Sequence, residues 1–367
     1  MHRISPMHKL VGCQVQQTYI LCILEMKKIL VVCAAMMLHC LLVHAQEADN
    51  NGITLNVVPR LDANYNINTQ KGVDNEHSWG NTSLYTLFEG NLSESFSFSI
   101  ANHWYQHKPK PLYKNFLRSD NVNWVDWLNL SYNIKDFTIT GGKVAMLVGG
   151  FEFDDYDWET HPVLNSTLWD SFVIYQWGGN IQWQISEDHA ITGQMTCSPY
   201  GRRPLKSGLM NWGLNWRGTF GDWETNTSFT LVQHTKLGKG TSFFKCYEKL
   251  LTVGIRGNFE PAVVTLDIFN KVGNEEEIMV NGITLAPSVT VNINEKLDVF
   301  GKGVIEHSKD KVPGFKQDVV KVGGGAHWRP LKNDQNLRVH ALVGYDSTFK
   351  SVILSAGVLY NFNIKVR

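Results

Sequence analysis

The amino-acid sequence predicts an all-β protein, a transmembrane antiparallel β-barrel of about 16 strands with short periplasmic turns and longer extracellular loops. Three observations lead to this fold class. Apolar and polar residues alternate with a period of two through most of the chain after residue 45. The connections between the alternating segments are short and long by turns, and aromatic residues gather at the ends of the segments.

Residues 26–45 are typical of a secretory signal peptide. Met26-Lys27-Lys28 gives a positively charged start, the following residues are almost wholly apolar, and Val43-His44-Ala45 is a small-residue cleavage site. A transmembrane anchor is the alternative, but the apolar run is shorter than the roughly 20 residues that a helix needs to cross a bilayer. We therefore expect cleavage between Ala45 and Gln46.

Residues 1–25 resemble neither a signal peptide nor a domain. A start codon assigned too early is the simplest account, with Met26 as the true start. The sequence thus divides into this upstream stretch, the signal peptide at 26–45 and the expected outer-membrane β-barrel at 46–367.

Composition and motifs exclude several other classes. Of the 6 cysteines, only Cys197 and Cys246 follow the signal peptide, too few for a disulfide framework. The 34 basic and 34 acidic residues balance, so nothing suggests a nucleic-acid partner. The sequence has no Gly-x-Ser-x-Gly motif, and histidines such as His161, His189 and His327 have no Ser or Asp at a catalytic spacing. We expect neither an enzyme nor a cofactor.

The alternating segments predict the strands in order, and the last one is the clearest. Val352, Leu354 and Ala356 share one face of it, while Ser351 and Ser355 share the other. The expected strands lie near 53–64, 82–92, 94–105, 124–134, 136–146, 170–185, 189–199, 210–220, 222–233, 247–259, 261–271, 281–293, 296–307, 316–328, 335–345 and 351–364.

The connections alternate in length, as they do in transmembrane barrels. Short turns lie at Ser93-Glu94, Lys135-Asp136, Glu187-Asp188, Gly221-Asp222, Glu260-Pro261 and Asn294-Glu295. Longer connections lie at about 65–81, 106–123, 147–169, 200–209, 234–246, 272–280 and 308–315. An even number of strands places both termini on the side of the short turns.

Aromatic residues form two expected levels, as at the two interfaces of a bilayer. The level on the loop side holds Trp104, Tyr105, Trp124, Trp127, Trp169, Trp212 and Tyr345. The level on the turn side holds Phe137, Trp223, Phe259, Trp328, Tyr360 and Phe362. The alternative is that these residues simply favour strands.

The second face of the strands is polar and often charged. Its bases are Arg60, Lys143, Arg217, Arg256, Lys302, Lys321 and Arg338, and it also carries Asp267, Asp298, Glu306 and His340. In a dry core each ionisable group would cost several kcal/mol unless it is paired, whereas a water-filled lumen removes that cost. A barrel of about 16 strands is also too wide for side chains to fill. The alternative is the solvated face of an open sheet in a soluble protein.

The longest connection, the third on the loop side, carries the strongest functional signal. Gly149 and Gly150 permit a sharp fold, and five acids follow: Glu152, Asp154, Asp155, Asp157 and Glu159. Folded into the barrel, these acids would line a constriction. Facing the lumen bases, they would create a transverse field that favours small polar solutes. A plain exposed acidic loop, or a calcium ion held by Asp154 and Asp155, are the alternatives.

The stretches Asp126–Tyr132, Phe137–Lys143 and Gly149–Glu152 resemble the phosphate-selective porin O and P family, in the divergent form found in Bacteroidetes. The shared pattern is a strand ending in Gly142-Lys143 that leads to a Gly-Gly-x-Glu loop. The resemblance implies a barrel of about sixteen strands, usually trimeric, that passes small anions or other polar solutes. The acidic third loop and the mixed inward charges argue against phosphate selectivity, because the selective members use many arginines.

Together these observations predict a porin in the outer membrane of a Gram-negative bacterium. We expect it to pass small polar or ionic solutes by passive diffusion and to contact outer-membrane lipid, and the resemblance implies a homotrimer. The alternative function is that of a secreted or surface-exposed Trp-rich β protein that binds carbohydrate or acts as an adhesin.

Overall fold

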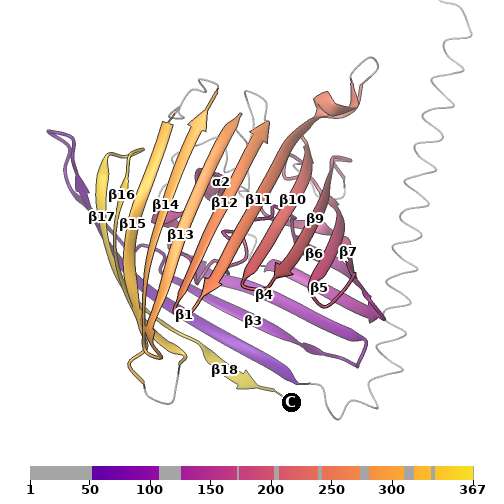
Figure 1. Cartoon of the computed structure of the whole chain (residues 1–367), viewed down its shortest axis with the longest axis horizontal. Helices are drawn as coiled ribbons and strands as arrows, with labels where there is room; N and C mark the ends of the chain where they lie inside the picture. Colours follow the sequence, from indigo (N-terminus) through magenta and orange to yellow (C-terminus); the bar gives the residue numbers. More distant parts are fainter. Residues whose placement is uncertain are drawn as a thin grey trace, which may run out of the picture. The chain divides into compact units, whose positions relative to one another are not determined.

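The structure, a computed structural model, describes residues 52–106, 125–171, 173–201, 206–238, 242–272, 281–309, 318–331 and 335–366. The expected signal peptide, the upstream stretch and Trp124 lie outside these ranges. Within them the chain forms a closed antiparallel barrel of sixteen long strands (Figure 1).

Each long strand of the barrel pairs with its neighbour in the sequence, and β17 pairs with β1 to close the sheet. The strands are β1 (Ile53–Asn68), β3 (Ser83–Asn91), β4 (Phe96–Gln106), β5 (Val125–Ile134), β6 (Phe137–Ala145), β7 (Tyr175–Gln184), β8 (His189–Cys197), β9 (Met210–Phe220), β10 (Trp223–Gln233), β11 (Tyr247–Phe259), β12 (Ala262–Val272), β13 (Gly282–Asn294), β14 (Leu297–Ser308), β15 (Asp318–Trp328), β16 (Leu337–Asp346) and β17 (Ser351–Tyr360). The short β2 (Glu76–Ser78) and β18 (Phe362–Lys365) also pair with β1.

The alternation of the sequence sets which side chains face outward. Leu354 on β17 lies between Tyr65 on β1 and Val343 on β16, and all three side chains are exposed. The next residue, Ser355, points to the inner face and is buried. A one-residue slip in register would exchange the two faces, so the apolar alternation fixes the pairing.

The aromatic levels are reproduced in part. Trp104, Tyr105 and Trp212 are exposed on the loop side, and Phe137, Trp223, Phe259, Trp328 and Phe362 are exposed on the turn side. Two expected members are wrong. Trp127 turns inward, where its Nε1 donates to Ser99 Oγ and its ring stacks on other aromatic rings, and Trp169 belongs to a helix inside the barrel.

Two other expectations about elements are wrong. The strand expected from residue 170 begins at Tyr175, because residues Thr167–Ser171 form the helix α2. The alternation of short and long connections also fails in the last hairpin. There β16 and β17 are joined on the loop side by only residues 347–350, whereas β15 and β16 are eight residues apart (329–336) on the turn side.

Residues 146–174, which join β6 to β7, lie inside the barrel and are called the inward loop (Figure 1). They include the 3-10 turn η1 (Pro162–Leu164) and the helix α2. A second 3-10 turn, η2 (Phe243–Cys246), precedes β11. None of the helices in the described ranges is long and apolar enough to cross a membrane.

Two buried apolar clusters join the inward loop to the barrel wall. The first, the apolar anchor, contains Met146, Val148 and Leu168 of the loop with Val232, Leu250, Phe269, Ala286 and Val304 of β10–β14. The second, the Trp158 cluster, contains Trp158 of the loop with Val58, Tyr85, Leu87, Ala101 and Leu359. Burial of these side chains is the main favourable contribution to loop docking, at about 1.5–3 kcal/mol for a fully buried large side chain.

Candidate pore constriction

Two glycines let the start of the inward loop lie directly on the wall. Gly149 and Gly150 have φ of 73° and 75°, in the left-handed region that favours glycine. A Cβ on Gly149 would lie 2.4 Å from Ser228 Oγ, and one on Gly150 would lie 3.0 Å from Asp267 Oδ1. Side chains at these positions would therefore push the loop away from β10 and β12.

Asp267 of β12 holds the backbone of the loop just after these glycines. Its carboxylate accepts hydrogen bonds from the N–H of Phe151 at 2.9 Å and of Glu152 at 2.7 Å. Asn226 of β10 adds a contact at 2.6 Å by donating from Nδ2 to the carbonyl of Gly150. Asp267 is buried, and hydrogen bonds from the backbone stabilise a carboxylate that would otherwise be costly to bury.

Glu152 closes the loop on itself. Its carboxylate lies 2.7 Å from Lys302 Nζ and accepts hydrogen bonds from the backbone N–H of Ser166 at 2.9 Å and from its hydroxyl at 2.6 Å. The side chain is buried, so this acid joins the two ends of the loop and is not exposed to the lumen. Lys302 also donates to Asn165 Oδ1 at 2.7 Å.

The tip of the inward loop, residues 154–156, is exposed. Asp154 accepts hydrogen bonds from Arg217 of β9 at 2.5 and 3.0 Å and from Asn226 Nδ2 at 3.3 Å. Asp155 makes no ion pair with any residue that the structure describes, although Lys302 and Arg256 are the bases that act on it electrostatically. Asp155 is therefore an acid of the tip that has no basic partner in contact.

A pocket of about 250 Å³ lies beside the tip, between Phe151 and the wall formed by β7–β10. Arg217 and Glu224 line it with opposite charges, and Gln182 and Gln184 add neutral polar groups. Arg256 lies 4.0 Å from the ring centroid of Phe151, at a distance typical of a cation–π contact, and 3.8 Å from Glu224. Acidic and basic side chains thus line the same pocket.

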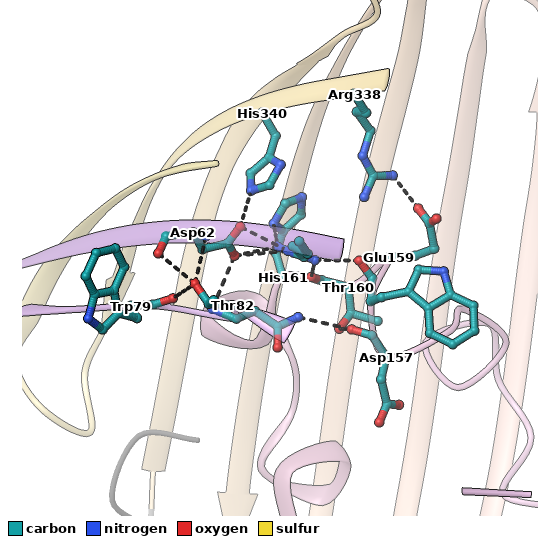
Figure 2. Close-up of polar contacts among 12 residues, drawn as sticks. Asp62, Trp79, Thr82, Asp157, Glu159, Thr160, His161, Arg338 and His340 are labelled. Carbon is teal, nitrogen blue, oxygen red and sulfur yellow. Dashed lines mark hydrogen bonds and ion pairs between the residues drawn. The ribbon is translucent and has the colours of Figure 1, made fainter. Parts of the chain in front are cut away.

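Arg60 of β1 holds the middle of the loop, next to Asp62, Thr160 and His161, which are labelled in Figure 2. Its Nη1 donates at 2.7 Å to the carbonyls of both Trp158 and Thr160, and its Nε donates to Asp62 at 3.0 Å. Arg60 and Asp62 are almost wholly buried, so the pair is shielded from solvent. We call these residues, with His161, His327 and His340, the polar clamp.

The histidines of the polar clamp extend it to β15 and β16. His340 Nε2 lies 3.0 Å from Asp62 Oδ1 across Gly357 of β17, where a Cβ would lie 2.2 Å from that oxygen. The ring of His161 stacks on Phe300 and its Nε2 lies 2.9 Å from His327 Nε2. Burial lowers the pKa of His161 well below its usual value, and Arg60 lowers it further.

The remaining loop acids each find a partner on the wall. Glu159 forms an ion pair with Arg338 of β16. Asp170 lies 3.1 Å from Lys321 of β15, and burial raises the pKa of Asp170 to about 6 although Lys321 opposes the shift. The carboxylate of Asp157 accepts a hydrogen bond from the hydroxyl of Tyr175 on β7, and its backbone carbonyl accepts one from Asn81 at 3.1 Å.

Six of the seven bases expected to face the lumen contact the inward loop: Arg60, Arg217, Arg256, Lys302, Lys321 and Arg338. The seventh, Lys143, instead donates to the carbonyl of Val125 on the neighbouring strand, 2.5 Å away. The two-residue alternation along each strand was enough to place these bases on the inner face. Their individual partners belong to a loop whose path the sequence pattern does not reveal.

The expectation that water solvates the inward charges is wrong for most of them. Arg60, Lys143, Lys321 and Arg338 are each at least nine-tenths buried, as are the acids Asp267, Asp298 and Glu306. Their burial is tolerated because nearly all have a charged or backbone partner, such as Arg329 for Asp298 at 2.6 Å. Arg217, Arg256 and Lys302 are the partly exposed bases.

Several residues of the site were missed in the sequence. Asp62 lies two residues after Arg60 on the same inward face, and that spacing was a usable signal. His161 and His327 are far apart in the sequence, and no pattern joins them. For the calcium alternative, the described ranges contain no group of three or more His, Cys, Asp or Glu side chains placed to hold a metal ion.

Comparison with known proteins identifies the fold. No family model matches the sequence, and no curated protein matches it. Among solved structures, a loop-deletion mutant of OmpT, an outer membrane protein of Vibrio cholerae, is 12% identical with a TM-score of 0.55, covering 86% of this chain and 100% of that one. A mutant porin of Rh. blastica is 12% identical with a TM-score of 0.56, covering 84% and 100%. The chain thus has the fold of outer-membrane porin barrels, while the phosphate-selective O and P family is not shown.

Proposed function

We propose that the chain is a porin of a Gram-negative outer membrane that passes small polar or ionic solutes by diffusion, with the inward loop as its constriction. The observation that carries this proposal is the position of the loop. It lies inside a sixteen-stranded barrel, is fixed to opposite parts of the wall by buried contacts, and carries an exposed charged tip. A fixed loop of this kind sets the size and charge of a passage.

The outer face supports the membrane location. It carries exposed apolar side chains on every long strand from β5 to β17, which suits lipid better than water. The alternative of a secreted carbohydrate-binding protein or adhesin is not favoured, because the solved structures with this fold are named as outer membrane proteins and porins. One of them is described as a trimer form, and we propose a homotrimer here as well.

Charge at the tip gives the first test. In planar bilayers under a salt gradient, the whole chain should give stepwise conductance, and its reversal potential reports the preference between cations and anions. Asp155→Asn removes the one tip acid that lacks a basic contact among the described residues, so we expect a shift toward anions. The matched control is Asp136→Asn, an exposed acid in the turn between β5 and β6.

Absence of any conductance from folded, heat-modifiable protein would contradict the channel. Equal reversal potentials for the wild type, Asp155→Asn and Asp136→Asn would leave the channel in place but remove the tip as its selective element. The phosphate expectation is tested in the same recordings by replacing chloride with phosphate. Because the lumen charges are of both signs, we expect no preference for phosphate.

A further inference from the structure

Tyr156, at the tip of the inward loop, is far more exposed than the other large apolar side chains of this loop. The other large apolar side chains at the core of the loop, Phe151, Trp158, Leu164 and Leu168, are all at most 4% exposed. Tyr156 is 40% exposed, and in the described part of the loop it alone belongs to the exposed large apolar side chains. An aromatic ring exposed inside the barrel can be reached by a solute in the lumen, and ligand sites are often lined by aromatic side chains.

Tyr156 is held rigidly, with one ring face free. Its ring stacks on Trp158 at 4.5 Å and on Trp127 at 5.5 Å, each at an interplanar angle of 16°. If the two Trp rings lay on opposite faces of Tyr156, their centroids would be separated by about the sum of these two distances. They are only 6.4 Å apart, so both Trp rings support Tyr156 from the same side.

The supporting rings are themselves fixed. Trp127 donates from Nε1 to Ser99 Oγ at 2.8 Å, and it also contacts the ring of Tyr175 at 5.4 Å. Trp158 packs against Tyr85 at 5.0 Å in the interior of the Trp158 cluster. A platform fixed in this way binds a flat ligand face without a large cost of side-chain ordering.

The groups around the free face are hydrogen-bond acceptors. Asp155 is the neighbour of Tyr156 in the chain and is exposed, and Glu89 of β3 is near enough to act electrostatically on the Tyr156 hydroxyl. Glu89 shares the inward face of Tyr85 and Leu87.

We propose that this platform is a stacking site for a sugar ring inside the lumen. A pyranose presents a flat face of C–H groups that fits an aromatic ring, and its edge of hydroxyl groups donates to carboxylates. A cage for an organic cation would need rings on more than one side of the ligand. Here both Trp rings lie behind Tyr156, so only the Tyr156 ring would face the ligand. The inference rests on the proposed channel, because the platform is reached only through the lumen.

Maltotriose added to a single conducting channel provides the test. We expect concentration-dependent interruptions of the current by wild type, an apparent affinity about tenfold weaker in Tyr156→Ala, and near wild-type behaviour in Tyr156→Phe. Phe244→Ala, which removes an exposed aromatic ring from η2, is the matched control and should behave as wild type.

Two results would overturn the sugar site while leaving the channel intact. One is an equal effect of maltotriose on wild type and Tyr156→Ala when both conduct normally. The other is block by tetramethylammonium, weakened in Tyr156→Ala, together with no effect of maltotriose. If Tyr156→Ala does not fold, Tyr156→Leu, which keeps apolar volume but removes the flat ring, must show the same loss. A chain that does not conduct at all contradicts the channel itself.

Discussion

The inward loop meets the barrel wall in two regions that differ in chemistry. On β10–β14 the apolar anchor buries aliphatic and aromatic side chains, among them Val148 of the loop and Phe269 of the wall. On β1, β15 and β16 the polar clamp buries an Arg–Asp pair and His340, with His161 and His327 half-buried beside them. Both regions bury side chains against the wall, yet only the second depends on charge.

This difference teaches what each region contributes. Apolar burial is non-directional and independent of pH, so the anchor gives affinity for the wall without fixing a unique position. Buried charges contribute little net energy but are very costly to leave unpaired, so the clamp permits one arrangement and penalises others. The loop would then be held down by one region and positioned by the other.

Removal of the largest side chain of the apolar anchor should have the greatest effect. Phe269→Ala leaves a cavity and should lower the free energy of unfolding by about 3–5 kcal/mol. The measurement is urea unfolding in detergent at several pH values, where the loss should not change with pH. Phe229→Ala on β10, exposed on the outer face, is the control for loss of a Phe from the barrel. A smaller loss for Phe269→Ala than for this control would contradict the anchor.

Breaking the polar clamp should lower the free energy of unfolding by nearly as much. Arg60→Gln leaves Asp62 buried with His340 and the backbone N–H of Asn81 as its remaining partners, and we expect a loss of about 3 kcal/mol. Arg217→Gln also removes an Arg–Asp pair, but this one is exposed and should cost below about 1 kcal/mol. If both substitutions cost the same, burial is not what distinguishes the clamp, and the comparison fails.

The gap at Gly357 gives a smaller, steric test of the clamp. Gly357→Ala places a methyl group where Asp62 and His340 meet, and the expected loss is about 1–3 kcal/mol. Gly141→Ala on β6 is the matched control, since a Cβ there has no neighbour within 4 Å. Single-channel recordings should show more current fluctuation in Gly357→Ala only. Equal and quiet currents in both variants would show that the loop does not depend on the Asp62–His340 contact.

Acid should loosen the clamp and not the anchor. The pKa of His161 is lower in the folded state than the 6.5 of the free side chain, so the unfolded chain binds the proton first as pH falls. The stability from neutral His161 is therefore present above about pH 6.5 and is lost below it, at up to about 1.4 kcal/mol per pH unit.

The measurement is unfolding of wild type and His161→Phe between pH 7 and pH 4, with His77→Phe on β2 as control. Asp170, with a pKa raised to about 6, acts in the opposite direction below that pH and does so in all three proteins. The difference between wild type and His161→Phe isolates His161. A difference that does not vary with pH would contradict the assignment.

Prediction from the sequence was most successful where one local rule governs the structure. Alternation along β17 placed Leu354 outside and Ser355 inside, because a barrel wall has only two faces. The same parity put Arg60 and Arg338 on the inner face. The aromatic levels failed for Trp127, because this residue shares the inward parity of Asn129 on β5 and packs against the loop.

The partners within the site could not be read from the sequence for a physical reason. Arg60 binds carbonyls 98 and 100 residues later, and backbone carbonyls carry no sequence signal. The sequence predicted that the loop after Gly149 and Gly150 folds into the barrel, but it did not show how much of the wall the loop would cover. The argument for a water-filled lumen therefore left out the wall charges that the loop buries.

The closure of the barrel between β1 and β17 has a consequence for the order of assembly. Arg60 and Asp62 lie on the first strand, while His340 and Gly357 lie on the last two, so these residues meet only when the sheet closes. Until then β1 presents an unpaired edge that could recruit another chain, and its partner strand is nearly 300 residues away. The polar clamp therefore assembles last, and a protein in which the loop is locked has already buried its most aggregation-prone edge.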